Sequence, residues 1–232
     1  MNAPETGQFQ RSQAMPLYSS VTSDNSSYID FSGHHVSVMG GSRAFWIAKH
    51  ALDFAVSVVA LPVLFLISVA LIVLNPFFNP GPLFYSQLRI GKDEKPFRIF
   101  KFRTVVLSPE SCSTERGLIT PFGAILRKFR IDEVPQFLNV MRGEMSLIGP
   151  RPEMVENVEK FSKILPNFHL RHLVRPGLSG LSQVTIGYTT CQLTYAQKLQ
   201  YDCQYIRNAG WRMEGRVFLR TIWVILTGFG AQ

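Results

Sequence analysis

The sequence predicts a mainly helical α+β fold, with a membrane-embedded helix, interfacial amphipathic helices and a small core that includes a β-hairpin. Residues 54–74 form a stretch of 21 residues without a charged side chain. Two further segments, 193–208 and 212–226, carry apolar residues at helical spacing. Residues 83–90 and 97–103 resemble two strands on either side of a short polar turn.

The N-terminal region differs in composition from the rest of the chain. Residues 1–42 are rich in Ser, Asn, Thr and Gly and show little periodicity. A segment of this kind has too little apolar surface to offset the entropy lost on folding, so we predict a disordered tail. Residues 43–232 then form one membrane-embedded domain, whose length is within the range of a single domain.

The segment 54–74 is predicted to enter a membrane, because about 20 apolar residues suffice for a helix to cross the bilayer. Pro62 removes a backbone hydrogen bond and favours a bend, although membrane helices tolerate proline. Basic residues prefer the cytoplasmic side of a membrane. Both flanks of the segment are basic, the second much more so. A spanning helix and a re-entrant helix therefore remain equally good interpretations of the residues alone.

The middle of the chain is predicted to alternate short elements and turns. Proline, glycine and asparagine in residues 75–82 should stop the membrane helix. Asp132 is expected to cap a helix that has Pro135 in its first turn and Gly143 just past its end. Other expected segments are a hairpin of strands 83–90 and 97–103 around the turn 91–96, a polar loop at 105–117, and helices at 124–129 and 153–165.

The C-terminal segment 212–226 places Arg212, Arg216 and Arg220 at four-residue intervals beside a broad apolar face. Such a helix is typical of a membrane interface. A core-packing helix with a solvated basic edge gives the same pattern. The periodicity favours neither interpretation.

Charge narrows the classes of partner. The net charge is +8 and the isoelectric point is about 9.6. Residues 88–232 hold 21 Lys and Arg against 12 Asp and Glu. A basic body beside an apolar segment favours anionic lipid headgroups or phosphorylated substrates. Nucleic acid is disfavoured, because the chain has a long uncharged segment and no recognised DNA- or RNA-binding motif.

Asp132 and Glu133 are the first candidate site residues. Adjacent acids at a helix start often only offset the helix dipole, a contribution of about 0.3–1 kcal/mol. A catalytic interpretation makes one carboxylate a nucleophile and its neighbour a metal ligand or base. Mg²⁺ and the nearby Arg127 and Arg130 would reduce the repulsion between a carboxylate and a diphosphate.

Two proline-flanked arginines are further candidates. Prolines on both sides of Arg151 would restrict the backbone and hold the guanidinium ready for a bidentate phosphate contact. Arg175, followed by Pro176 and Gly177, repeats that arrangement. The alternative in each case is a stiff loop with a solvated arginine. Lys101 and Arg103 fit an exposed strand edge equally well.

In order and spacing, these motifs resemble the bacterial sugar transferases, the monotopic polyprenyl-phosphate hexose-1-phosphate transferases of exopolysaccharide-initiating type. The resemblance extends from about residue 43 to the C-terminus. The matching stretches are residues 81–87, 89–91, 96–97, 101–104, 132–136, 143–152 and 175–180.

The resemblance implies a membrane helix that is re-entrant, bent at Pro62 and cytoplasmic at both ends, in the bacterial inner membrane with the catalytic core facing the cytoplasm. Asp132 would attack the β-phosphate of a UDP-sugar, release UMP and hold the sugar phosphate covalently. Glu133 would help to hold Mg²⁺ and assist deprotonation. Undecaprenyl phosphate would then accept the hexose phosphate, with glucose or galactose favoured. Residues implied in phosphate binding are Arg103, Arg127, Arg151 and Arg175.

Three departures from the family pattern leave the choice of sugar open. Leu61 precedes Pro62 where many members have serine, and Leu118 stands where many have arginine. In residues 181–188 an aromatic residue and an arginine of the usual motif are both replaced. These changes motivate one alternative function, a non-catalytic membrane scaffold of a polysaccharide assembly complex. Membrane lipid is an expected partner, and self-association into a homo-oligomer is left open.

Overall fold

The computed structural model describes residues 39–106, 118–165, 167–187 and 192–228, and the backbone of three short strands nearer the N-terminus. These strands, β1 (Ser20–Val21), β2 (Ser27–Ile29) and β3 (His35–Ser37), form an antiparallel sheet in that order. They lie within the predicted disordered tail. Most of that tail is outside the described residues, so the prediction stays a prediction. Its last residues are packed, because the Gly40 amide donates to the Ile206 carbonyl at 2.9 Å.

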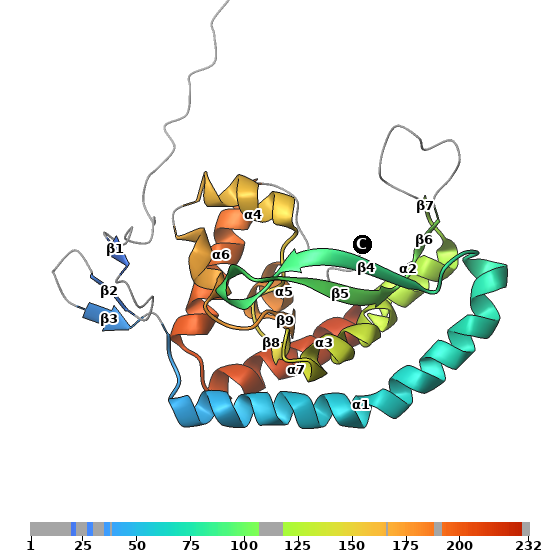
Figure 1. Ribbon diagram of the computed structural model, residues 1–232, viewed down its shortest axis with the longest axis horizontal. Coiled ribbons are helices and arrows are strands. Elements are labelled where there is room, and N and C mark those ends of the chain that lie inside the picture. The colour runs from blue at the N-terminus through green and yellow to red at the C-terminus, as the bar shows by residue number, and fades with distance from the viewer. Residues whose placement is uncertain are drawn as a thin grey trace, which may run out of the picture.

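The longest element is α1 (Arg43–Phe78), whose ribbon lies along one side of the molecule and bends partway along its length (Figure 1). Ser42 caps it, because its hydroxyl accepts from the Phe45 amide at 3.1 Å. The predicted segment 54–74 lies within this helix. The predicted stop at 75–82 was placed early, since the helix continues through Pro76. That proline lies in the last turn, which the Asn79 amide closes by donating to Asn75.

Much of α1 is exposed although it is apolar. By length and composition it is the one helix of the described residues able to cross a membrane, and 17% of its most apolar window is buried. Part of α7 (Trp211–Thr227) is similar, since Leu219 and Leu226 are 68% and 79% exposed. Contiguous exposed apolar surface marks a site of membrane or protein interaction. The two helices therefore fit contact with lipid.

The predicted hairpin is confirmed. Strands β4 (Phe84–Ile90) and β5 (Pro96–Phe102) pair antiparallel along their whole length. The turn between them contains the short 3₁₀ helix η1 (Lys92–Glu94). Asn139 joins the hairpin to the helix behind it by donating to the Arg98 carbonyl at 2.7 Å and accepting from the Phe100 amide at 3.2 Å.

The acidic pair lies in a 3₁₀ helix, η2 (Ile131–Gln136), and does not begin an α-helix. Arg130 occupies the cap position in the left-handed region, at φ 58°, and Asp132 lies inside the first turn. The predicted N-cap role of Asp132 was therefore wrong by two residues. A left-handed residue redirects the chain sharply after α2 (Pro121–Lys128), which carries the acids back towards the hairpin. Gly143, at φ 75°, follows α3 (Phe137–Met141) as predicted.

The remaining elements build the second half of the core. The predicted helices near the C-terminus are confirmed as α6 and α7, and the helix predicted at 153–165 is shorter. The elements are β6 (Val105–Val106), β7 (Leu118–Ile119), β8 (Ser146–Ile148), α4 (Val155–Ser162), η3 (Phe168–His172), β9 (Gly177–Ser179), α5 (Leu181–Ile186) and α6 (Gln192–Arg207).

Two apolar clusters join α1 and the C-terminal helices to the rest of the core. One lies among β8, α5, α6 and α7 and includes Tyr205 and Val217, which are almost fully buried. The other joins α1 to β5 and α2 through Leu64, Leu71 and Phe102. Apolar residues of η2 pack against this second cluster. The acidic pair therefore rests on a core to which the long apolar helix contributes directly.

A buried polar cluster fixes the first half of α1 to the core. The Lys49 ammonium contacts Glu214 of α7 at 2.6 Å. The Tyr205 hydroxyl donates to the other oxygen of Glu214, also at 2.6 Å. Four residues further along α1, Asp53 accepts from the Ser146 hydroxyl at 2.6 Å. Charges at these positions belong to the protein interior, so the first turns of α1 are held by protein contacts.

Candidate active site

The acidic pair lies where η2 packs on strand β5. Asp132 and Glu133 are each 8% exposed. Strand β5 supplies Lys101, and the loop after β8 supplies Arg151. Both cations reach the pair from segments distant in sequence, so the site depends on the packing of the whole core. Figure 1 shows β5 lying over the segment that carries α2 and α3.

Glu133 is fixed by two cations. Its Oε1 accepts from the Lys101 ammonium at 2.9 Å and from the Arg151 guanidinium at 3.0 Å. Although burial opposes ionisation, these two charges hold the pKa of Glu133 well below its ordinary value. Burial lowers the pKa of Lys101 in spite of the attraction of Glu133. We conclude that Glu133 is a carboxylate at neutral pH, held in place by its contacts with Lys101 and Arg151.

The pKa of Asp132 is shifted in the opposite direction from that of Glu133. Burial, followed by the negative charge of Glu133, raises its pKa above the ordinary value of 3.8, although Lys101, Arg127 and Arg130 act against this rise. Two adjacent acids with opposite pKa shifts are typical of sites in which each acid has a different role. The protein therefore disfavours the charge on Asp132 and favours the charge on Glu133.

Arg127 reaches the site from the last turn of α2. Its Nε donates to the Thr104 hydroxyl at 2.8 Å, which orients the guanidinium. Its positive charge acts on Asp132, so the two lie close together. The structure thus brings Arg127 and Arg151 to the acidic pair, as the sequence predicts. That they bind phosphate stays a prediction.

Close backbone contact places Arg151 at the site. Strands β8 and β9 pair in parallel, so residues 149–152 lie beside residues 175–177. The Gly177 amide donates to the Pro150 carbonyl at 2.9 Å. A Cβ atom on Gly149 would lie 2.5 Å from the Arg175 carbonyl oxygen, so only glycine fits there. The two proline-containing motifs are therefore one structural unit.

Arg175 lies elsewhere in this unit. Its guanidinium lies against Gly143, where an added Cβ would be 3.5 Å from the nearest guanidinium nitrogen. Among the described residues, no hydrogen bond or ion pair joins Arg175 to Asp132 or Glu133. Its backbone contacts support the loop that carries Arg151, and its predicted role with phosphate stays a prediction.

Arg103 clamps the connection after α1. Its guanidinium donates to four backbone carbonyl oxygens, those of Asn79, Pro80, Pro82 and Val105, at 2.6–2.8 Å. An arginine has five N–H donors. Four of them are used here, so the side chain orders the turn between the apolar helix and the hairpin. This arrangement favours a structural role over the phosphate contact that the resemblance implies.

Arg103→Lys is expected to lower stability by about 2 kcal/mol, because lysine cannot replace a fork of hydrogen bonds to carbonyl oxygens. If the protein acts on a phosphorylated substrate, as the resemblance implies, the KM of the folded protein for that substrate should stay unchanged. Thermal unfolding and substrate kinetics check the two parts. Arg98→Lys, at an exposed position on the preceding strand β5, is the matched control. A large rise in KM at unchanged stability would instead assign Arg103 to phosphate binding.

Lys101 was not among the predicted site residues, although its position in strand β5 indicates an inward-facing side chain. Phe97 and Ile99, at alternate positions of β5, are buried. Lys101 continues that alternation, so its side chain starts on the inward face. A lysine in such a position needs a carboxylate partner. Arg171 was also missed; its side chain is buried and bonds to the Arg151 carbonyl.

The residues at the site fit Mg²⁺ only in part. Among the described residues, no group of three or more His, Cys, Asp or Glu side chains is arranged to hold a metal. Mg²⁺ commonly binds through one or two carboxylates and completes its shell with substrate phosphate and water. Asp132 and Glu133 supply those carboxylates. The donor set therefore suits an ion that arrives with a diphosphate.

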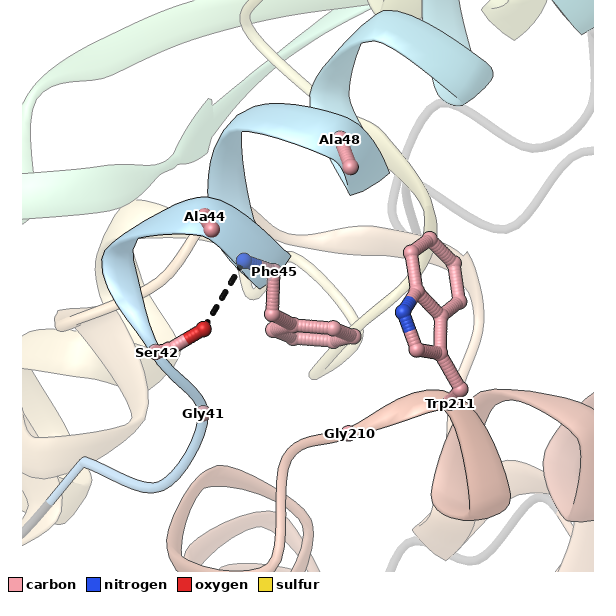
Figure 2. Close-up of a pocket in the computed structure, with 7 residues that line it drawn as sticks. All are labelled: Gly41, Ser42, Ala44, Phe45, Ala48, Gly210 and Trp211. Carbon is pink, nitrogen blue, oxygen red and sulfur yellow. Dashed lines mark hydrogen bonds between the residues drawn. The ribbon is translucent and has the colours of Figure 1, made fainter.

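A pocket of about 420 Å³ lies away from these residues, between the start of α1 and the turn before α7. Figure 2 shows the Phe45 and Trp211 side chains on its two sides and the hydrogen bond that caps α1. The two rings meet edge to face at 5.1 Å. Its lining is largely apolar and carries no ionisable side chain. The pocket therefore has no acidic, basic or thiol side chain that could act as a catalytic group.

Comparison with known proteins gives a consistent result. The sequence profile of a family described as "Bacterial sugar transferase" matches residues 44–228. The chain is 39% identical over 189 residues to the UDP-N-acetylgalactosamine-undecaprenyl-phosphate N-acetylgalactosaminephosphotransferase of Aeromonas hydrophila, covering 79% of this chain and 45% of that protein. It is 34% identical over 185 residues to the UDP-glucose:undecaprenyl-phosphate glucose-1-phosphate transferase of Xanthomonas campestris pv. campestris, covering 76% and 38%.

A shorter relative aligns over almost all of its length. The exopolysaccharide production protein PSS of Rhizobium leguminosarum bv. phaseoli is 34% identical over 189 residues, which cover 76% of this chain and 94% of that protein. The chain spans less than half the length of the two transferases above. The matched family region contains every residue of the candidate site.

Proposed function

The chain belongs to the bacterial sugar transferase family, and from that premise we propose that it transfers a sugar 1-phosphate from a UDP-sugar to undecaprenyl phosphate at a membrane. Relatives whose names state this reaction use glucose or N-acetylgalactosamine. The observation that carries the proposal is the buried acidic pair with opposite pKa shifts, surrounded by Lys101, Arg127 and Arg151. A cationic enclosure suits a substrate with two phosphates.

In the first half-reaction, a carboxylate oxygen of Asp132 attacks the β-phosphorus of the UDP-sugar. A bond forms between that oxygen and phosphorus, while the bond from phosphorus to the bridging oxygen breaks. UMP leaves with the electron pair, and the sugar phosphate stays on Asp132. A carboxylate that the protein solvates poorly is a better nucleophile than one held in strong hydrogen bonds.

In the second half-reaction, a phosphate oxygen of undecaprenyl phosphate attacks the same phosphorus. The bond to Asp132 breaks and its carboxylate is restored, which leaves the sugar on a lipid diphosphate. Mg²⁺, when bound, would neutralise phosphate charge beside Asp132 and Glu133. The lowered pKa of Glu133 makes it a weak base. We therefore propose Glu133 as a holder of cations more than as a proton acceptor.

We also propose that α1 is re-entrant and bends at Pro62. Its first half is fixed to the core through Lys49 and Asp53, and its second half through Leu64 and Leu71. A straight helix of 36 residues is about 54 Å long, far more than the roughly 30 Å of bilayer hydrocarbon. Contacts of both halves with one core support a helix that enters and leaves on the same side. The excess of basic residues in the core favours the cytoplasm as that side.

A donor panel tests the reaction. Purified protein in nanodiscs, with undecaprenyl phosphate and Mg²⁺, should release UMP from UDP-glucose or UDP-galactose, which we favour as donors. N-acetylated UDP-sugars complete the panel, because relatives include an N-acetylgalactosamine enzyme. Chelation of Mg²⁺ should stop release, and its return should restore it. Absence of UMP with every donor would contradict the proposed function and favour a membrane scaffold.

Cysteine labelling tests the topology. Arg43 is the first residue of α1, and Lys95 lies in the hairpin turn that follows α1 in the chain; both are exposed. Each is replaced by cysteine in a chain whose native cysteines are changed to serine. A membrane-impermeant maleimide added to intact spheroplasts should label neither position, and permeabilised cells should be labelled at both. Labelling of one position alone in intact spheroplasts would show that α1 spans the membrane.

A further inference from the structure

Arg171 is a buried arginine that the proposed reaction does not use. It lies in the 3₁₀ helix η3 and is 3% exposed. Its Nη2 donates to the Arg151 carbonyl oxygen at 2.9 Å. Arg151 in turn contacts Glu133 through its own guanidinium at 3.0 Å. Arg171 is thus linked to the acidic pair through a single intermediate residue, Arg151.

Two buried carboxylates hold the Arg171 guanidinium in place. Its Nη1 lies 3.3 Å from Glu153 Oε1, and its Nη2 lies 2.8 Å from Asp202 Oδ2. Glu153 is 5% exposed and Asp202 is 1% exposed. Although burial acts in the other direction, the two carboxylates raise the pKa of Arg171 above its ordinary value. The guanidinium is therefore charged and has little freedom to rotate.

A second layer of contacts orients this group. The Ser182 hydroxyl donates to the other oxygen of Asp202 at 2.9 Å. Ser182 lies in α5 and Asp202 in α6, so both helices contribute to the position of Arg171. Ser182 belongs to the segment 181–188 that departs from the usual family motif. In this chain that segment therefore makes a polar contact with α6.

Such a network is poor as a device for stability alone. Replacing buried ion pairs with apolar residues is often neutral or stabilising, because burying the charged groups costs the free energy of taking them out of water. A buried ion-pair network is more easily explained where it holds another group in a defined position. Here the fixed group is the carbonyl of Arg151, in a loop whose guanidinium holds Glu133.

We propose that Arg171, oriented by Asp202 and Ser182, is a positioning residue that sets the place of Arg151 at the acidic pair. The loop 149–152 is held on one side by its pairing with β9 and on the other by Arg171. Arg171 touches the backbone of Arg151 and acts on the reaction only through it. The kinetic part of this inference rests on the proposed function.

A double-mutant cycle tests the proposal. Arg171→Lys alone should lower kcat/KM for UMP release about 10- to 100-fold, the usual cost of losing a group that orients a catalytic one. In an Arg151→Lys background, the same change should cause little further loss, because the guanidinium whose position Arg171 sets is already absent. Equal losses in the two backgrounds would overturn the proposal and make Arg171 a purely structural residue.

Milder and independent variants guard against misfolding. Ser182→Ala removes one hydrogen bond and should lower kcat/KM about two- to tenfold, again with little further effect in the Arg151→Lys background. Arg98→Lys, at an exposed site on β5, should leave both backgrounds unchanged. Additive losses with Ser182→Ala would count against the proposal even if Arg171→Lys fails to fold.

A spectroscopic readout does not depend on activity. In protein labelled with ¹⁵N-arginine and held in nanodiscs, the Arg151 side-chain signal is the one that Arg151→Lys removes. Its guanidinium should rotate slowly in the wild-type protein and faster in Arg171→Lys. An unchanged Arg151 signal would overturn the proposal. If the wild-type protein releases no UMP, the proposed function fails, while this measurement still decides the role of Arg171.

Discussion

Asp132→Asn is expected to lower the rate of UMP release by at least about 10⁴-fold, because an amide cannot serve as the attacking carboxylate. The sugar-phosphate adduct should disappear as well. Intact-mass spectrometry of protein mixed with UDP-sugar, without the lipid acceptor, checks this directly. Wild-type protein should gain the mass of one sugar phosphate, and peptide mapping should place it on Asp132.

The same substitution is expected to stabilise the folded protein at neutral pH. Asp132 has a raised pKa, so the folded state disfavours the charge that the unfolded chain accommodates freely. Asparagine removes that cost. The gain should be complete above the folded pKa, shrink as the pH falls, and vanish below the ordinary value of 3.8. Thermal unfolding measured across this pH range gives the sign.

Asp93→Asn is the matched control for Asp132→Asn. Asp93 is exposed in the turn of the hairpin and has φ 55°, a conformation that asparagine adopts readily. We expect wild-type activity and stability. An Asp132→Asn protein that keeps its rate, or an adduct found on another residue, would contradict the assignment of Asp132 as nucleophile.

Glu133→Gln is expected to have the opposite effect on stability. The pKa of Glu133 is held well below its ordinary value, so its charge stabilises the fold by pairing with Lys101 and Arg151. A neutral amide leaves two largely buried cations without their carboxylate, at a cost of about 3 kcal/mol. For a chain of this size, that corresponds to a fall of about 6–12 °C in Tm.

The loss caused by Glu133→Gln should depend on pH. A carboxyl group with a lowered pKa contributes its stability above the unfolded value, which is 4.5 here. The difference from wild type should therefore be full at neutral pH and shrink as the pH falls below 4.5. Activity should fall about 10²- to 10³-fold, since Lys101 and Arg151 lose the group that orients them.

Glu159→Gln provides the comparison, because Glu159 is exposed on α4. Its Tm should lie close to wild type. A Glu133→Gln protein that is as stable as wild type would show that Lys101 and Arg151 find other partners. The two substitutions at neighbouring acids thus predict shifts in Tm of opposite sign, which misfolding in general does not explain.

Periodicity explains which parts of the fold could be predicted. Helices α6 and α7 and the β4–β5 hairpin follow local patterns of apolar residues, so their residues alone indicate them. The interior of α1 was recognised for the same reason. Its end was misplaced, because a proline in the last turn of a helix costs only one hydrogen bond, and the Asn79 amide still closes that turn on the Asn75 carbonyl.

The partners of individual side chains were harder to predict from the sequence, because they depend on contacts between distant segments. Arg103 is predicted from its motif to contact phosphate, whereas its bonds to the carbonyls of residues 79–82 become visible only in the folded chain. Asp132 resembles a helix cap until Arg130 takes that position in a left-handed conformation. Lys101 is paired with an acid 32 residues away. Residue types predict the chemistry, whereas tertiary packing determines which partners each side chain contacts.

The contribution of α1 to the core has a practical consequence for anyone who wants a water-soluble version of this protein. Leu64 and Leu71 pack beneath the segment that carries Asp132, and Lys49 and Asp53 bind partners on α7 and β8. Removing the helix would leave a cavity beneath Asp132 and would leave Glu214 without its Lys49 partner. Crystallisation trials and inhibitor screens are better served by the whole chain in a lipid carrier than by a trimmed fragment.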